Sequence, residues 1–115
     1  MKNPLDPRHT KRQHLVEELY KGDFHSQKID PTARLILDKK EELDKEITKA
    51  APEFPIEKIN KVDLAILRLA MYELTIDKKE PPRVVVDEAV ELAKEYGGAS
   101  SSAFINGALG HIIQK

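Results

Sequence analysis

The feature that most constrains this chain is a segment that is apolar on most sides, from Lys61 to about Ile76. A helix of this kind is buried at the centre of a fold, because none of its faces suits water. Asn60 stands where a helix cap is expected, and Asp63 is placed as in a capping box. The segment therefore predicts a central helix against which other helices pack. Its apolar residues are Val62, Leu64, Ala65, Ile66, Leu67, Leu69, Ala70, Met71 and Leu74.

Glu73 is the exception on this helix, because it falls on the side occupied by Val62, Ile66, Leu69 and Ala70. An unpaired buried charge costs several kcal/mol. We therefore expect Glu73 to be paired or hydrogen-bonded, although the sequence does not identify its partner.

Helical spacing recurs in the rest of the chain, and no alternation typical of a strand persists. Proline and glycine punctuate the helical segments, and Asp30-Pro31 is a clear start signal. These patterns predict an all-α fold of five to six helices in a single domain, residues 1–115. Besides the central helix, the expected helical segments are Pro7 or His9 to Lys21, Pro31 to about Ala51, a short turn at Ile56 to Ile59, about Arg83 to Tyr96, and a last helix capped by Ser100, Ser101 or Ser102.

Charge is unevenly placed along the chain, although the formal net charge is only −1. The N-terminal end, up to His14, is basic. A local basic end makes a modest phosphate contact, but it does not drive strong non-specific binding by itself. If nucleic acid is the ligand, a partner protein is expected to help. The charged residues of this end are Lys2, Arg8, Lys11 and Arg12 against Asp6, with His9 and His14 alongside.

Several classes of protein are disfavoured by the sequence. No apolar run approaches the length of a membrane span, and the N-terminus has no apolar signal region, so a cytoplasmic location is expected. Cysteine is absent, and no two of the four histidines have the spacing of a helical metal site. No phosphate-binding loop or nucleophile elbow is present. We expect no enzymatic activity, no metal and no cofactor.

Two C-terminal segments carry a resemblance to the NusB family. The first is VDLAILRLAMYEL, from Val62 to Leu74, and the second runs from Pro82 through VVVDEAVELAKEYG to FINGALG. The order and spacing of both match the family's pattern over about the last 55 residues. Arg12 and Leu19-Tyr20 match more weakly the arginine-rich first helix, which ends in Leu-Tyr. Within these motifs, Arg68, Glu73, Glu88 and Asn106 are interpreted as structural.

The resemblance implies an all-α fold of two three-helix groups and a role in transcription antitermination. Proteins of this family bind the single-stranded boxA element of ribosomal RNA transcripts, with the ribosomal protein NusE as partner. The complex joins the transcription elongation complex, and no cofactor is involved.

The resemblance also implies site residues. The expected RNA-binding residues are Arg8, Lys11, Arg12, Tyr20, Ser100, Ser101 and Phe104, and the expected NusE-facing residue is Asp63. Cations would hold the RNA backbone, while an aromatic ring and a helix N-terminus receive a base and a phosphate. The alternative interpretations are core packing for Tyr20 and Phe104, simple solvation for Arg8 and Arg12, and a cap alone for Asp63.

The chain departs from the family's pattern at three places. The arginine cluster is thinned to Arg8, His9, Lys11 and Arg12, and Ser100 replaces an acidic residue. The stretch between Tyr20 and Asn60 is about twenty residues short, which predicts a shortened N-terminal half that lacks one helix. These departures leave open a second hypothesis, a helical protein-interaction module without specific RNA binding. A third is a fragment of an rRNA methyltransferase, since some of those enzymes carry a similar domain.

Overall fold

The structure, a computed structural model, describes residues 6–24 and 30–110. In these residues every regular element is a helix, as expected for an all-α chain. The elements are α1 (Pro7–Phe24), α2 (Pro31–Asp38), α3 (Lys40–Ala50), the short 3-10 turn η1 (Ile56–Lys58), α4 (Lys61–Tyr72), the π-helical turn η2 (Glu73–Asp77) and α5 (Pro82–Leu109).

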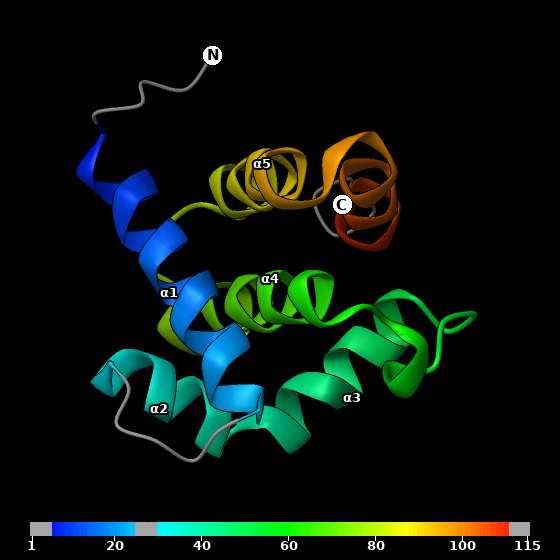
Figure 1. Ribbon diagram of the computed structural model, residues 1–115, viewed down its shortest axis with the longest axis horizontal. Coiled ribbons are helices and arrows are strands. Elements are labelled where there is room, and N and C mark those ends of the chain that lie inside the picture. The colour runs from blue at the N-terminus through cyan, green and yellow to red at the C-terminus, as the bar shows by residue number, and fades with distance from the viewer. Residues whose placement is uncertain (1–5, 25–29, 111–115) are drawn as a thin grey trace.

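Helix α4 lies at the centre of the molecule, as its apolar sequence predicts. It packs against α1, α3 and α5, which surround it in Figure 1. Residues 63–71 are all buried, and Ile66 and Leu67 are at most 1% exposed. The expected cap is also present, because the Asn60 side chain accepts a hydrogen bond from the Asp63 backbone N–H at 3.0 Å. The prediction of a central buried helix is confirmed.

The N-terminal half contains three helices rather than the two that the sequence suggested. The segment expected as one helix after Asp30 is divided at Lys39, whose ψ of 14° interrupts the helix between α2 and α3. No proline or glycine marks this break, so spacing alone could not reveal it. The Asp30 cap is confirmed, with its Oδ1 atom accepting from the Thr32 N–H at 2.7 Å. The expectation of a lost helix is wrong, because α1, α2 and α3 all precede α4.

Helix α1 continues beyond its expected end. Gly22 does not stop it, and the helix runs on to Phe24. Its inward side carries the apolar residues Leu15, Val16 and Leu19, each at most 4% exposed. These three residues make a short apolar stripe, so other contacts must hold the N-terminal half of the helix in place.

The end of α4 widens into the π-turn η2. The Lys78 N–H donates to the Glu73 carbonyl at 2.9 Å, five residues back, and Lys78 then takes a left-handed conformation with φ of 57°. Because a π-turn adds a residue to the helical turn, it shifts the register of the residues after it.

Helix α5 consists of two segments, residues 82–97 and 99–109, separated by Gly98. This glycine has φ of 78° and ψ of −160°, a conformation that favours glycine. A helix that ends near Tyr96 and a separate last helix were expected, and the break between them is confirmed at Gly98. The expected serine cap is wrong, because the chain resumes its helix directly after Gly98 and Ser100, Ser101 and Ser102 already lie within the helix.

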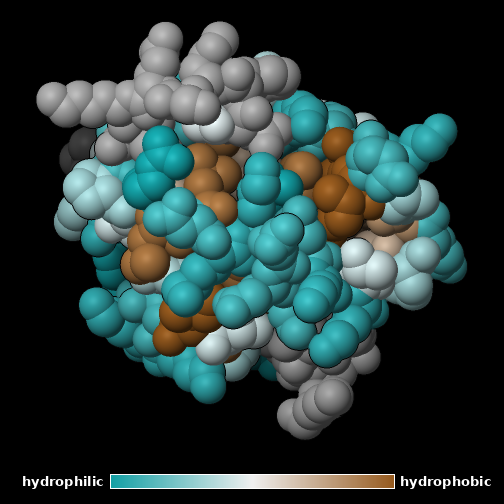
Figure 2. All heavy atoms as spheres, turned by 90° about the horizontal axis from the view of Figure 1, so that it is seen from below, coloured by the Kyte–Doolittle hydropathy of each residue, from teal (hydrophilic) through white to brown (hydrophobic). Residues whose placement is uncertain are grey.

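The face formed by α2 and α3 is mainly hydrophilic. Seen from this side, hydrophobic side chains form separate patches among polar ones, with no continuous apolar area (Figure 2). Among the described residues, no helix combines the length and the apolar character that crossing a membrane requires.

Candidate nucleic-acid interface

Arg12, expected to face RNA, lies in the interior. The residue is 7% exposed, and its guanidinium binds Glu73 through two hydrogen bonds, Nε to Oε2 at 2.8 Å and Nη2 to Oε1 at 2.7 Å. A third nitrogen, Nη1, lies 3.8 Å from Oε1 of Glu88. Burial lowers the pKa of Arg12, but the hydrogen bonds to Glu73 and the negative charges of Glu73, Glu88 and Glu80 together outweigh this effect and raise it. Arg12 is therefore a largely buried charged group that is bound to Glu73, with a small part of its surface at the hollow beside Arg8 and Lys11.

This pair also supplies the partner that the sequence left unidentified. Glu73 is 8% exposed, and the expectation that it must be paired is confirmed. Both charges lie on the apolar sides of their helices, Arg12 beside Val16 and Leu19, and Glu73 beside Leu69. Two opposite charges on two inward faces are therefore a sequence signal for a buried pair.

Arg8 and Lys11 remain at the surface, beside the end of α4. They border a hollow of about 220 Å³ that Tyr72 and Lys79 also line. The Arg8 side chain is 66% exposed, but it lies 3.5 Å from Asp6 and 3.6 Å from Glu80. Its charge is thus partly balanced by carboxylates. Lys11 is exposed as well, and the described part of the chain offers it no ion pair.

Tyr20 projects from a different side of α1. Nine residues separate Lys11 from Tyr20, and at about 100° per residue their side chains point about 180° apart. Tyr20 is 39% exposed and lies one helical turn from Glu17. The Glu17 carboxylate accepts a hydrogen bond of 2.6 Å from the Tyr96 hydroxyl, which ties this side of α1 to the end of the first segment of α5.

Ser100, Ser101 and Phe104 belong to the second segment of α5. Ser100 is exposed, four residues after Tyr96. Ser101 is 6% exposed and is therefore not available as a surface ligand. Phe104 is half-buried, and its ring meets that of Phe54 edge to face, with centroids 4.9 Å apart and an interplanar angle of 74°.

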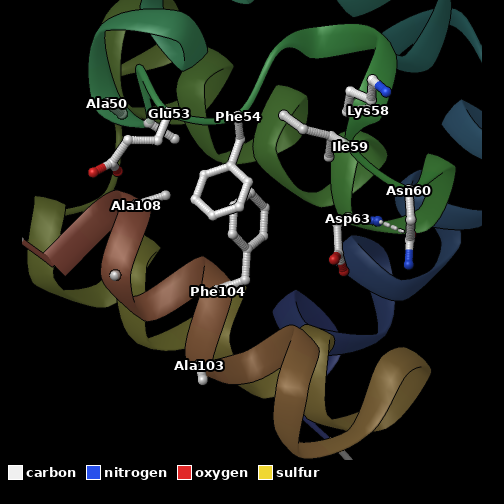
Figure 3. A pocket seen from close by; sticks show the side chains of 12 residues that line it. Ala50, Glu53, Phe54, Lys58, Ile59, Asn60, Asp63, Ala103, Phe104 and Ala108 are labelled. Carbon is white, nitrogen blue, oxygen red and sulfur yellow. Dashed lines mark hydrogen bonds between the residues drawn. The ribbon is translucent and has the colours of Figure 1, made fainter.

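Phe54 and Phe104 form part of a groove of about 560 Å³ between the 51–60 segment and the second segment of α5. Figure 3 shows the two rings facing each other, with Asp63 and Asn60 at the far end of the groove. Ala103 and Gly107 line it on the α5 side, where a methyl group and the absence of a side chain leave space. Phe54 could not be recognised from the sequence as part of a site, because it stands outside any helix, between Pro52 and Pro55. An aromatic residue held in a proline-bounded loop was the only available signal.

Asp63 is the unusual polar group of this groove. The residue is 7% exposed, and its Oδ1 atom has no hydrogen-bond partner among the described residues. Burial raises the pKa of Asp63, and a hydrogen bond from Ser101 opposes the shift only in part. The capping-box expectation is thus half confirmed: Asn60 caps Asp63, while the Asp63 carboxylate faces the groove (Figure 3).

The expected site residues therefore form two groups rather than one. Arg8 and Lys11 lie near Tyr72 at the end of α4, and Phe104 lies near Asp63 at its beginning. At about 1.5 Å per residue, the nine residues between Asp63 and Tyr72 separate the groups by about 13 Å along the helix axis. Within the described residues no cluster of three His, Asp or Glu side chains could hold a metal ion.

The chain is similar to known proteins over most of its length. A sequence model described as the NusB family matches residues 7–114. The transcription antitermination protein NusB of Clostridium botulinum (strain Hall) is 40% identical over 116 residues, which cover 98% of this chain and 81% of that protein.

Solved structures give the same result for the fold. T. maritima NusB superposes with a TM-score of 0.78 at 29% identity, covering 100% of this chain and 94% of that one. A structure of antitermination factors NusB and NusE in complex with dsRNA gives a TM-score of 0.77 at 24% identity, covering 96% and 98%. Since sequence and fold agree over nearly the whole chain, it belongs to the NusB family.

Proposed function

We propose that this chain is a transcription antitermination factor that binds boxA-type single-stranded RNA of ribosomal RNA transcripts together with NusE. Two comparisons support the proposal: the C. botulinum relative is an antitermination protein, and the NusB of similar fold was solved with NusE and dsRNA. The role is one of binding within the transcription elongation complex in the cytoplasm. It requires no catalytic step and no cofactor.

The proposed RNA-binding surface is supported mainly by one contact, the hydrogen bond of 2.6 Å that the Tyr96 hydroxyl donates to the Glu17 carboxylate. It joins Glu17, one turn before Tyr20 on α1, to the first segment of α5, four residues before the exposed Ser100. An exposed ring can stack on an unpaired base, and the first turn of a helix favours a phosphate. Phe104, four residues after Ser100 on the same helical segment, offers a second aromatic ring.

Arg8 and Lys11 are proposed as phosphate contacts at the other side of α1. Both are exposed cations, and Lys79 adds a third beside them. Arg12 and Ser101 are buried, so we assign them an indirect role: Arg12 holds α1 in place, and Ser101 lowers the pKa of Asp63.

Asp63 is proposed as a contact for NusE. Its unpartnered Oδ1 atom would accept a hydrogen bond from a donor that enters the groove, which would remove the cost of leaving this oxygen unsatisfied. Replacing Asp63 by Asn keeps the shape and removes the charge. We expect Asp63→Asn to weaken NusE binding while leaving RNA binding by the isolated chain unchanged.

The proposal is tested by gel-shift titration with a boxA RNA, with and without NusE, at several salt concentrations. We expect binding that weakens with salt and strengthens when NusE is added. For single strands the slope of log K against log salt changes by about 0.7 per phosphate contact, so Arg8→Ala with Lys11→Ala should reduce it by about 1.4. Tyr20→Ala should reduce affinity with no change in slope, because stacking involves no counterion.

Lys40→Ala with Lys45→Ala is the matched control, since it removes two exposed cations from α3 and changes net charge equally. An equal loss of slope in the control would show that total charge matters and that Arg8 and Lys11 are not specific contacts. No binding to boxA RNA with or without NusE would contradict the proposed function.

A second candidate function is a protein-interaction module that keeps NusE binding without RNA binding. The burial of Arg12 and the ion pairs of Arg8 favour it, because they reduce the cations available to RNA. Stable co-purification with NusE, combined with no gel shift of the RNA by the complex, would support this candidate.

A further inference from the structure

His9 lies between the exposed cations of α1, but its own side chain points inwards against α5. The residue is 3% exposed. Its Nδ1 atom lies 2.7 Å from Oε1 of Glu88, and its Nε2 atom lies 2.8 Å from Oε2 of Glu95. Glu88 and Glu95 are seven residues apart, about two turns, so both carboxylates project from one side of the first segment of α5.

The two contacts define the charge of the ring. An ionised carboxylate only accepts hydrogen bonds, and a neutral imidazole donates from one nitrogen only. Both ring nitrogens can donate only when the ring carries two protons. We infer that His9 is held as an imidazolium which fastens the N-terminal half of α1 to α5, and that loss of its proton releases this attachment.

The surrounding charges support this assignment. Gln13 of α1 donates to Oε1 of Glu95 at 3.1 Å, and the Arg12 guanidinium lies 3.8 Å from Glu88 but is already bound to Glu73 of η2. With His9 charged, two cations face the three carboxylates. With His9 neutral, one cation would face all three, which is unfavourable in a buried site.

The pKa of His9 follows from these contacts. Burial lowers it, but the hydrogen bonds to Glu88 and Glu95 and the negative charges of these carboxylates together outweigh burial and raise the pKa above its usual 6.5. A raised pKa in the folded chain adds stability that is fully present below 6.5 and is lost as the pH rises through the folded value. Each pKa unit of difference corresponds to about a tenfold change in the folding equilibrium constant.

A consequence for RNA binding rests on the proposed function. Arg8 and Lys11 flank His9 in the sequence and project from the part of α1 that His9 attaches. When His9 loses its proton, Arg12 still fastens this half of α1, but these two cations are held less firmly. RNA affinity should therefore fall over the pH range in which His9 titrates.

His9→Gln and His9→Arg test the inference. Gln is uncharged and carries both of its donors on one nitrogen atom, whereas Arg is a permanent cation with several donors. The experiment follows urea unfolding from mildly acidic to alkaline pH, together with ¹⁵N NMR of the histidine rings of the full chain. His14→Gln is the control, because His14 is an exposed histidine on the same helix, 3.3 Å from Asp30.

We expect the signal that disappears in His9→Gln to show both ring nitrogens protonated at pH values above 6.5. The urea midpoint of the wild type and of His14→Gln should fall as His9 titrates, and that of His9→Arg should stay level. If His9→Gln does not fold, the comparison of wild type with His9→Arg carries the test. A neutral His9 ring at mildly acidic pH, or equal pH dependence in wild type and His9→Arg, would overturn the inference.

The RNA titration separates this inference from the proposed function. Affinity should fall with pH in the wild type and less in His9→Arg. Affinity that does not change while the His9 ring titrates would refute the effect on Arg8 and Lys11. Absence of RNA binding at every pH, with the expected ring signals and urea midpoints, would reject the proposed function and leave the His9 attachment standing.

Discussion

Replacing Arg12 by Ala should destabilise the fold strongly, because it leaves Glu73 buried without its partner. Glu73 is 8% exposed and receives two hydrogen bonds from Arg12. Two charges about 4 Å apart interact by about 4 kcal/mol at an effective dielectric constant of about 20. Removing one member of a buried pair costs about 3–5 kcal/mol. That loss is a large fraction of the about 5–15 kcal/mol by which domains are stable.

The measurement is urea unfolding followed by far-UV circular dichroism at neutral pH. With a denaturant slope of about 2 kcal/mol per molar, the midpoint of Arg12→Ala should fall by about 2 M. Arg12→Met combined with Glu73→Leu should recover most of the loss, because well-packed apolar residues often replace a buried pair at little cost. Lys11→Ala is the matched control, an exposed cation on the same helix, and its midpoint should change little.

Two results would refute this reasoning. If Arg12→Ala unfolds at the same urea concentration as Lys11→Ala, the Arg12–Glu73 pair does not hold α1 in place. If Arg12→Ala stays folded but loses boxA RNA binding, Arg12 is a direct contact, as the family resemblance first implied.

Four further changes test other parts of the structure by urea or thermal unfolding. Asp63→Asn should raise the free energy of unfolding by about 1 kcal/mol at neutral pH, because the cost of a buried unsatisfied carboxylate, about 1–3 kcal/mol, exceeds the helix-dipole benefit of about 0.3–1 kcal/mol. Since burial raises the pKa of Asp63, this gain should shrink as the pH falls through that pKa. A gain that is the same at every pH would contradict the prediction. Gly98→Ala should cost about 1–3 kcal/mol because of its φ of 78°. Gly107→Ala should instead raise the free energy of unfolding by about 0.5–1 kcal/mol. An added Cβ would meet no atom within 4 Å at either glycine, so the two positions differ only in backbone conformation. Equal effects at the two glycines would contradict this explanation. Ile66→Ala should cost about 2–5 kcal/mol, and a loss under 1 kcal/mol would show that α4 is not the packed centre.

The main features of the fold could be predicted from the sequence because they depend on local signals. The apolar surface around Ile66 marked the central helix, Asn60 marked its start, and Gly97-Gly98 marked the break in α5. Each signal is a property of a few neighbouring residues. The serines after Gly98 misled the prediction of the cap, because a glycine in a suitable conformation had already begun the helix.

The break at Lys39 and the π-turn after Tyr72 could not be predicted, because both depend on packing between distant helices. Neither contains the proline or glycine that usually marks such a point. Helical periodicity continues through Lys39, and only the docking of α2 and α3 on different parts of the core divides them.

The candidate site was predicted less well than the fold, because a residue's type does not give its direction. Arg12 was grouped with Arg8 as a cation, although its position beside Val16 and Leu19 already placed it on the inward side of α1. His9 was noted as part of the basic end, and its contacts with Glu88 and Glu95 were invisible because 79 and 86 residues separate the partners.

These long separations have a consequence for how the protein is made. The carboxylates that hold α1 come 61, 79 and 86 residues after the α1 side chains they bind. At about 5–20 residues per second, the ribosome completes Glu95 about 4–17 s after His9. During synthesis α1 has few apolar residues to expose and keeps its charges in water. Helix α1 is therefore made well before the carboxylates that hold its N-terminal half.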